Sequence, residues 1–148
     1  VDAVTKAEFL GEFDGEVASG KHTAIGADAF DELSKIIGIY NQDRFLGHVD
    51  KVNLVKGDVT KTIPGFIDQH RHLVVSLLFL DVDLYEPTRV ALEHFVPRMP
   101  KGAVIAFDEL DNPIWPGETL AAMETVGLNR LRIRRFPWDP DIGYAVIE

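Results

Sequence analysis

The chain has 148 residues, 46% of them hydrophobic, and a formal net charge of −9. This length and composition suit one globular domain with a sizeable core. The absence of cysteine excludes disulfide bonds and thiolate metal sites and is compatible with a reducing compartment. The acidic charge disfavours binding to nucleic acid, which needs clustered Lys and Arg.

No apolar run approaches the ~20 residues that span a bilayer. The first residues also lack the basic and apolar regions of a secretory signal. We therefore expect a cytoplasmic protein without nucleic-acid or membrane partners.

The N-terminal part of the chain predicts an irregular segment followed by a helix. Residues 1–27 contain spaced glycines and mixed charges, which favour irregular structure. Asp28 suits the N-cap of a helix over residues 29–40. The apolar residues of that helix recur on one face: Phe30, Leu33, Ile36, Ile37 and Tyr40.

A short strand and a second helix are predicted next. Residues 52–55, Val-Asn-Leu-Val, suit a strand that ends before Gly57 and Asp58. A helix over residues 62–69 would hold Pro64 in its first turn, where proline is tolerated.

The longest apolar run predicts the central strand, over residues 74–81. Because this run is almost continuously apolar, we expect the strand to be buried on both faces, as in a parallel sheet. Asp81 and Asp83 follow where the strand leaves the core. Pro87 suits the first position of a helix that ends near residue 95. We assign Asp83 to capping of that helix or to a supporting role beside Asp81.

A second buried strand, over residues 103–107, also ends in acid, at Asp108 and Glu109. A helix over residues 117–126, closed by Gly127, follows it.

Two short strands are predicted to close the chain, over residues 131–136 and 144–147, as an antiparallel hairpin. Alternation of helices and strands predicts a single α/β domain with a mainly parallel sheet covered by helices on both sides.

The acids at the strand ends are the best indication of function. Ligands of open α/β sheets bind at the carboxyl ends of the strands, where Asp81, Asp108 and Glu109 are expected to converge. Three carboxylates repel one another unless a cation intervenes, and their hard oxygens suit Mg²⁺, Mn²⁺ or Ca²⁺. We interpret this set as a metal site. The alternative is that the acids cap helices or solvate loops.

Gly57 and Asp58 end the strand over residues 52–55 at the same edge. Glycine there lets a bound nucleotide approach the backbone closely, and the carboxylate can accept a hydrogen bond from an exocyclic amine. The alternative is an ordinary turn, in which Gly-Asp is common.

Three segments of this sequence resemble the macrocin O-methyltransferase family. The first is Phe79-Leu80-Asp81-Val82-Asp83-Leu84-Tyr85-Glu86-Pro87-Thr88, the second is Ala91-Leu92-Glu93-His94-Phe95-Val96-Pro97-Arg98, and the third is Lys101-Gly102-Ala103-Val104-Ile105-Ala106-Phe107-Asp108-Glu109. The clear resemblance covers residues 58–126. These enzymes use S-adenosylmethionine to methylate sugar hydroxyls in natural-product pathways, including antibiotic biosynthesis.

The resemblance implies a Rossmann-like, three-layer methyltransferase fold and a Mg²⁺ site. Asp81 and Asp108 would be metal ligands, with Glu109 as a ligand where the family usually has a second Asp. The metal would bind two vicinal hydroxyls of the sugar and lower the pKa of one. Asp81 would also serve as the catalytic group that takes the proton.

The resemblance further implies a cofactor site at Gly57, Asp58 and Val59, with Asp58 beside the adenine of S-adenosylmethionine. The partner would be a small, glycosylated acceptor, and the oligomeric state stays open. The chain lacks the glycine-rich loop and the ribose-binding acid that the family uses. We therefore interpret residues 1–148 as a class I methyltransferase-like domain without its N-terminal part, and we expect weak cofactor binding.

Two other functions remain as alternatives. Asp81-Val82-Asp83 also resembles the signature of haloacid-dehalogenase-like phosphatases, although only 27 residues separate Asp81 from Asp108. The other alternative is a truncated domain that binds or interacts without catalysis.

Overall fold

The structure is a computed structural model that describes residues 27–148. Its elements in chain order are α3 (Ala27–Asp43), α4 (Val59–Gln69), β1 (Leu77–Leu80), α5 (Tyr85–Phe95), the 3₁₀ turn η2 (Val96–Arg98), β2 (Val104–Phe107), α6 (Gly117–Thr125), the 3₁₀ turn η3 (Leu128–Arg130), β3 (Arg134–Phe136) and β4 (Asp139–Val146). The expected irregularity of residues 1–26 lies outside the described residues. The predicted α/β class is confirmed.

The sheet is mixed, and its strands lie in the order β1-β2-β4-β3. β1 and β2 are parallel and in register, so that Leu80 lies opposite Phe107. β4 runs antiparallel to β2 and to β3, and Phe107 lies opposite Gly143. The parallel pair formed by the two predicted buried strands and the predicted C-terminal antiparallel hairpin are therefore both confirmed, in a sheet that is mixed rather than mainly parallel over the described residues.

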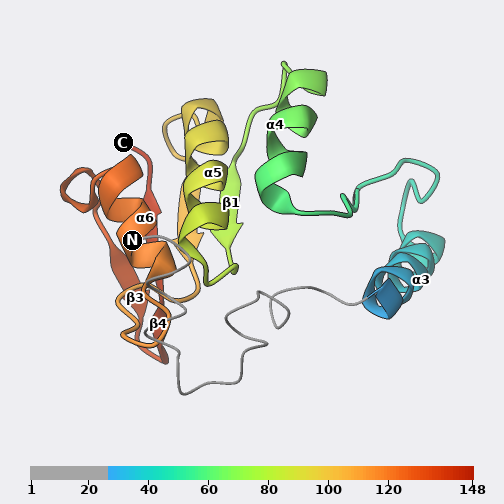
Figure 1. Cartoon of the computed structure of the whole chain (residues 1–148). Helices are drawn as coiled ribbons and strands as arrows, with labels where there is room; N and C mark the ends of the chain where they lie inside the picture. The colour runs from blue at the N-terminus through green and yellow to red at the C-terminus, as the bar shows by residue number, and fades with distance from the viewer. Residues whose placement is uncertain (1–26) are drawn as a thin grey trace.

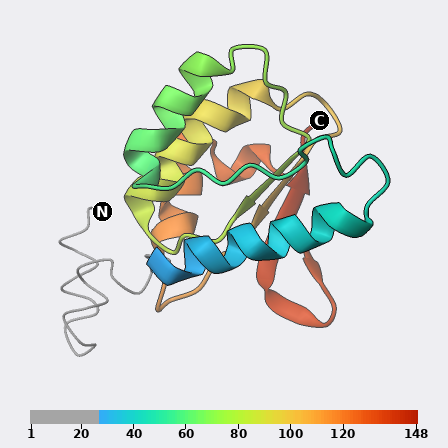
Figure 2. The same cartoon turned by 90° about the vertical axis from the view of Figure 1, so that its right-hand side faces the viewer.

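Three helices cover one face of the sheet, whereas the prediction has helices on both faces; the other face is uncovered among the described residues. α5 lies between α4 and α6, and all three lie on the same side of the strands in both views (Figure 1, Figure 2). The core forms where the alternate residues of β1 and β2 meet α5 and α6: Leu78, Leu80, Ile105, Phe107, Leu92, Ala121 and Ala122. Burial of these apolar side chains stabilises the layer by roughly 1.5–3 kcal/mol for each large residue.

The prediction that β1 is buried on both faces is wrong for the part of the chain that the structure describes. Burial alternates along the strand: Leu78 and Leu80 are buried, whereas Leu77 and Phe79 are 61% and 48% exposed. The two exposed residues point away from the helices, because successive strand residues point to opposite faces. β1 is also an edge strand here.

The predicted strand over residues 52–55 is also wrong, because this segment has no regular structure and lies in the connection from α3 to α4. α4 begins at Val59 rather than near residue 62, so Pro64 lies inside the helix and not in its first turn. α3 begins at Ala27, so Asp28 is not its N-cap.

The apolar face predicted for α3 meets little of the described protein. Leu33, Ile36 and Tyr40 are all exposed, and α3 lies apart from the sheet in Figure 1. None of the described helices is both long and apolar enough to pass through a membrane.

Candidate active site

Asp81 and Asp108 lie side by side at the end of the two parallel strands. Leu80 lies opposite Phe107, and the backbone N–H of Asp108 donates a hydrogen bond to the carbonyl of Leu80 at 2.9 Å. Each aspartate is thus the first residue beyond its strand. The structure brings this predicted pair together at the predicted edge.

Asp108 lies in a strongly negative environment. Burial is the largest cause that raises the pKa of its carboxyl, and the charges of Asp81, Asp83, Asp139 and Asp141 raise the pKa further. Asp139 and Asp141 come from the start of β4, because the end of β2 lies beside the start of that antiparallel strand. Sequence reasoning missed these two acids. The only available signal was that the predicted turn before the last strand was rich in Asp.

Glu109 makes a hydrogen bond within its own loop, and its role as a metal ligand stays a prediction. Asn112 donates a hydrogen bond from its side-chain amide to the Glu109 carboxylate. The Asn112 side-chain oxygen accepts from the backbone N–H of Ile114 at 2.8 Å and of Trp115 at 3.2 Å. Burial raises the pKa of Glu109, while the Asn112 hydrogen bond lowers it. Glu109 therefore takes part in the organisation of its own loop.

Glu118 joins the two loops that carry the acids. Its side chain is fully buried, and its two oxygens accept from the backbone N–H of Val82 at 3.1 Å and of Glu109 at 3.2 Å. Burial raises the pKa of Glu118 to about 7, although backbone hydrogen bonds from Val82, Glu109 and Asp83 act to lower it. The predicted helix over residues 117–126 gave no indication of this role for Glu118.

Gly117 lets α6 approach the β1–α5 loop. A Cβ at Gly117 would lie 2.2 Å from the carbonyl oxygen of Asp83 and 2.5 Å from the backbone nitrogen of Tyr85. Because both neighbours are backbone atoms, no side-chain rotation could relieve the contact. Only glycine fits here, and its fit places the Glu118 carboxylate between the loops.

Asp83 does not act as the predicted helix cap. The N-cap of α5 is Leu84, and no side chain caps this end of the helix. Asp83 instead occupies the left-handed backbone region, with φ of 55°, and its charge contributes to the raised pKa of Asp108 and Glu109. The structure therefore places Asp83 in an acidic cluster with Asp81, Asp108, Asp139 and Asp141.

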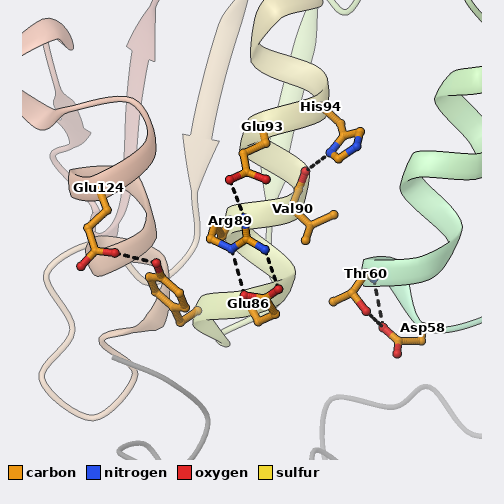
Figure 3. Close-up of polar contacts among 9 residues, drawn as sticks. Asp58, Thr60, Glu86, Arg89, Val90, Glu93, His94 and Glu124 are labelled. Atoms are coloured by element: carbon orange, nitrogen blue, oxygen red, sulfur yellow. Dashed lines mark hydrogen bonds and ion pairs between the residues drawn. The ribbon is translucent and has the colours of Figure 1, made fainter.

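Asp58 caps α4. Its carboxylate accepts from the backbone N–H of Thr60 at 3.0 Å and from the Thr60 hydroxyl at 2.7 Å (Figure 3). The Lys61 ammonium lies 3.3 Å from the same carboxylate. The Thr60 hydroxyl is the largest cause that lowers the pKa of Asp58. Gly57 precedes it with φ of 138°, a conformation that favours glycine. This geometry agrees with the ordinary-turn interpretation, and a contact with a cofactor stays a prediction.

Val59 lines an apolar pocket of about 170 Å³. The pocket lies between α4, the preceding segment and the end of α5, and its other lining residues are Val55, Thr62, Ile63, Phe66 and Phe95. Val59, one of the three predicted cofactor residues, therefore contributes to a pocket that is lined mostly by apolar side chains.

The exposed surface of α5 carries ion pairs that are separate from the acidic cluster. Arg89 contacts Glu86 at 2.6 Å and Glu93 at 2.5 Å (Figure 3). The Tyr85 hydroxyl donates to Glu124 of α6 at 2.5 Å. These contacts support the helix layer, and exposed pairs of this kind contribute little individually.

The acidic cluster fits a divalent cation in chemistry but only partly in arrangement. Asp81 and Asp108 offer the oxygens that Mg²⁺ prefers, and a cation would relieve their repulsion. Within residues 27–148, however, no group of three acidic or histidine side chains is arranged to hold a metal ion. Asn112 already engages one oxygen of Glu109. Asp81 and Asp108 therefore fit the role by their chemistry and position, and ligation by Glu109 would use the oxygen that Asn112 leaves open.

Comparison with solved structures finds sugar O-methyltransferases that are similar to this chain. Apo CalS11, a TDP-rhamnose 3'-O-methyltransferase of calicheamicin biosynthesis, is 37% identical over 83% of this chain and 53% of its own length, with a TM-score of 0.77. A second CalS11 structure, described as a calicheamicin methyltransferase, is 37% identical over 83% of this chain and 48% of its own, with a TM-score of 0.79. The resemblance to sugar O-methyltransferases is confirmed. The Rossmann-like α/β fold agrees with this relationship, and the chain spans about half the length of CalS11.

The remaining comparisons add less. The O-methyltransferase NovP is 23% identical over 50% of this chain and 30% of its own, and the TM-score of 0.43 is too low to carry an argument. No family model and no curated protein matches the chain. The phosphatase alternative receives no support from these relatives, which are methyltransferases.

Proposed function

We propose that this protein is an S-adenosylmethionine-dependent and Mg²⁺-dependent O-methyltransferase that acts on a sugar hydroxyl of a natural product. The observation that carries the proposal is the pair Asp81 and Asp108, which lies at the ends of adjacent parallel strands. These strands belong to a chain that is 37% identical to CalS11 over 83% of its length. The proposal extends to Asp81 and Asp108 as metal ligands and to Gly57, Asp58 and Val59 as cofactor neighbours.

The residues of this chain would orient the acceptor and accept its proton. Asp81 is exposed at the end of β1, where its carboxylate can reach an acceptor hydroxyl and take the proton as a general base. Glu118 holds the Asp81 loop against the Asp108 loop through backbone hydrogen bonds, which limits the movement of both acids. When bound, Mg²⁺ would acidify the hydroxyl and S-adenosylmethionine would supply the methyl group.

Calorimetry and a methyl-transfer assay test this proposal. We expect calorimetry to detect binding of Mg²⁺ and weak binding of S-adenosylmethionine, and the transfer assay uses labelled cofactor and a rhamnose-bearing acceptor. Asp108→Asn should lower the Mg²⁺ affinity, whereas Glu93→Asn, an exposed acid on α5, should not. Mg²⁺ affinity that is the same in both variants would contradict the metal assignment.

A second candidate is a domain that binds a partner without catalysis. The exposed apolar residues on the helix-free face of the sheet, Leu77, Phe79 and Val146, favour it. A pure interaction domain should bind neither Mg²⁺ nor S-adenosylmethionine, so the same calorimetry separates the two candidates.

A further inference from the structure

Three aromatic rings of the β3–β4 hairpin form a stack with Phe136 in the middle. The Phe136 ring lies 4.9 Å from the Tyr144 ring at an interplanar angle of 24°, and 5.3 Å from the Trp138 ring at 23°. Trp138 is 79% exposed, although tryptophan is one of the larger apolar side chains. The stack therefore presents an indole ring to solvent and supports it from behind with two further rings.

The hairpin tip lies at the same edge of the sheet as the acidic cluster. Gly143 is opposite Phe107, which directly precedes Asp108, and Phe136 is opposite Asp139 at the start of β4. In Figure 1 the arrow of β1 and the tip of the β3–β4 hairpin both point to the lower edge of the sheet. The electrostatic effect of Asp139 on Asp108 agrees with this proximity.

We propose that Trp138, supported by Phe136 and Tyr144, is a platform on which the ring of a neutral sugar stacks beside the acidic cluster. This inference rests on the proposed function and names the part of the protein that selects its acceptor. A pyranose ring has one face made of C–H groups, which packs against a flat aromatic ring, and an edge of hydroxyls. Aromatic side chains supply large, rigid contact area at low entropic cost.

The charges around the tip are of both signs. Asp139 and Asp141 stand at the start of β4, and both affect the Asp108 carboxyl. Arg134 lies opposite Tyr144 in the sheet, and Arg135 lies 3.5 Å from Asp111. Acids and arginines therefore both lie near the stack, where they can accept hydrogen bonds from, and donate them to, the hydroxyls of an uncharged sugar.

Saturation-transfer NMR with methyl α-rhamnoside tests the platform in the full chain. We expect transfer from the protein to the ring C–H protons of the glycoside, strongest for the protons of one ring face. Trp138→Ala should weaken the apparent binding about five-fold, because one aromatic stacking contact is lost. Phe45→Ala is the matched control, since Phe45 is 89% exposed in the loop after α3, and it should leave the signal unchanged.

Two further ligands complete the experiment. Sorbitol is an open-chain polyol without a ring face of C–H groups, so it should not compete with the glycoside at equal concentration. Thymidine carries a flat base that also stacks on aromatic rings, and it should bind no more tightly than the glycoside. Equal transfer in Trp138→Ala and wild type, with the amide NMR spectrum showing both folded, would overturn the inference. So would stronger binding of sorbitol or thymidine.

The measurement needs neither S-adenosylmethionine nor metal. Sugar binding by a protein that binds neither Mg²⁺ nor S-adenosylmethionine would leave the platform standing and count against the proposed function. Binding of Mg²⁺ and S-adenosylmethionine, with sugar affinity unchanged in Trp138→Ala, would support the proposed function and overturn the platform.

Discussion

Glu118 and Val82 are joined by a hydrogen bond of 3.1 Å across 36 residues of sequence, from the Val82 backbone N–H to the buried Glu118 carboxylate. The other oxygen of the same carboxylate accepts from Glu109. One buried side chain thus connects the loop after β1 to the loop after β2. The positions of Asp81 and Asp108 relative to each other depend on this connection.

Glu118→Ala should reduce the free energy of unfolding by about 2–4 kcal/mol. Two buried N–H donors would lose their acceptor, and each such loss costs about 1–3 kcal/mol. Urea unfolding followed by circular dichroism measures the change. Glu124→Ala, on the same helix but exposed, is the control and should cost less than about 1 kcal/mol. Equal losses in the two variants would show that the bridge does not stabilise the loops.

Gly117→Ala should destabilise the protein by roughly 2 kcal/mol or more, because the new Cβ meets backbone atoms of Asp83 and Tyr85 and α6 must shift. Gly65→Ala provides a matched control in α4, where a Cβ meets nothing within 4 Å. That variant should be more stable by about 0.5–1 kcal/mol, since alanine favours a helix interior over glycine. Thermal unfolding measures the change in stability of each variant, and the two changes should have opposite signs. Changes of the same sign would contradict the close packing of Gly117 against the β1–α5 loop.

The cap of α4 should weaken in acid. Because the Thr60 hydroxyl and backbone lower the pKa of Asp58, its stabilising contribution is present above its ordinary pKa of 3.8 and is lost as the pH falls through the lower pKa of the folded state. Carbon-detected NMR titration should give a pKa below 3.8 for Asp58.

Two variants make the acid prediction specific. Thr60→Val should move the Asp58 pKa back toward its ordinary value, since the variant removes the hydroxyl donor. Asp58→Asn should keep the cap without titrating, because Asn is also a good N-cap. If amide exchange in the first turn of α4 depends equally on pH in Asp58→Asn and wild type, the cap is not the cause.

Asp81→Asn should lower the Mg²⁺ affinity about ten-fold or more, because it removes a direct ligand. Even the loss of a group that only supports a ligand lowers metal affinity about 10–100-fold. Asp83→Asn should have a smaller effect, because Asp83 contributes charge to the cluster and we assign it no direct ligation. Isothermal titration with Mg²⁺ alone measures both. Equal losses would mean that Asp83 ligates as Asp81 does, and wild-type protein that binds no Mg²⁺ would contradict the proposed metal site.

The local pattern of the sequence was sufficient for the parallel pair and its acids. Apolar runs that end in Asp81 and Asp108 predicted adjacent strands, and hydrogen bonding between the strands then places these two residues side by side. Pattern alone misjudged the segment over residues 52–55 and the second face of β1. A strand needs partners for its backbone groups and a covered face needs something packed on it, and neither requirement can be read from a short apolar run.

Only the tertiary structure decided which other groups surround the pair. Asp139 and Asp141 reach Asp108 because β4 runs antiparallel beside β2, and Glu118 reaches Val82 because Gly117 allows α6 to pack against the backbone of the β1–α5 loop. The sequence by itself determined the strand ends and their carboxylates, since hydrophobic periodicity and residue type are local properties. The side chains that position and surround these carboxylates come from distant parts of the chain, and packing in three dimensions alone brings them together.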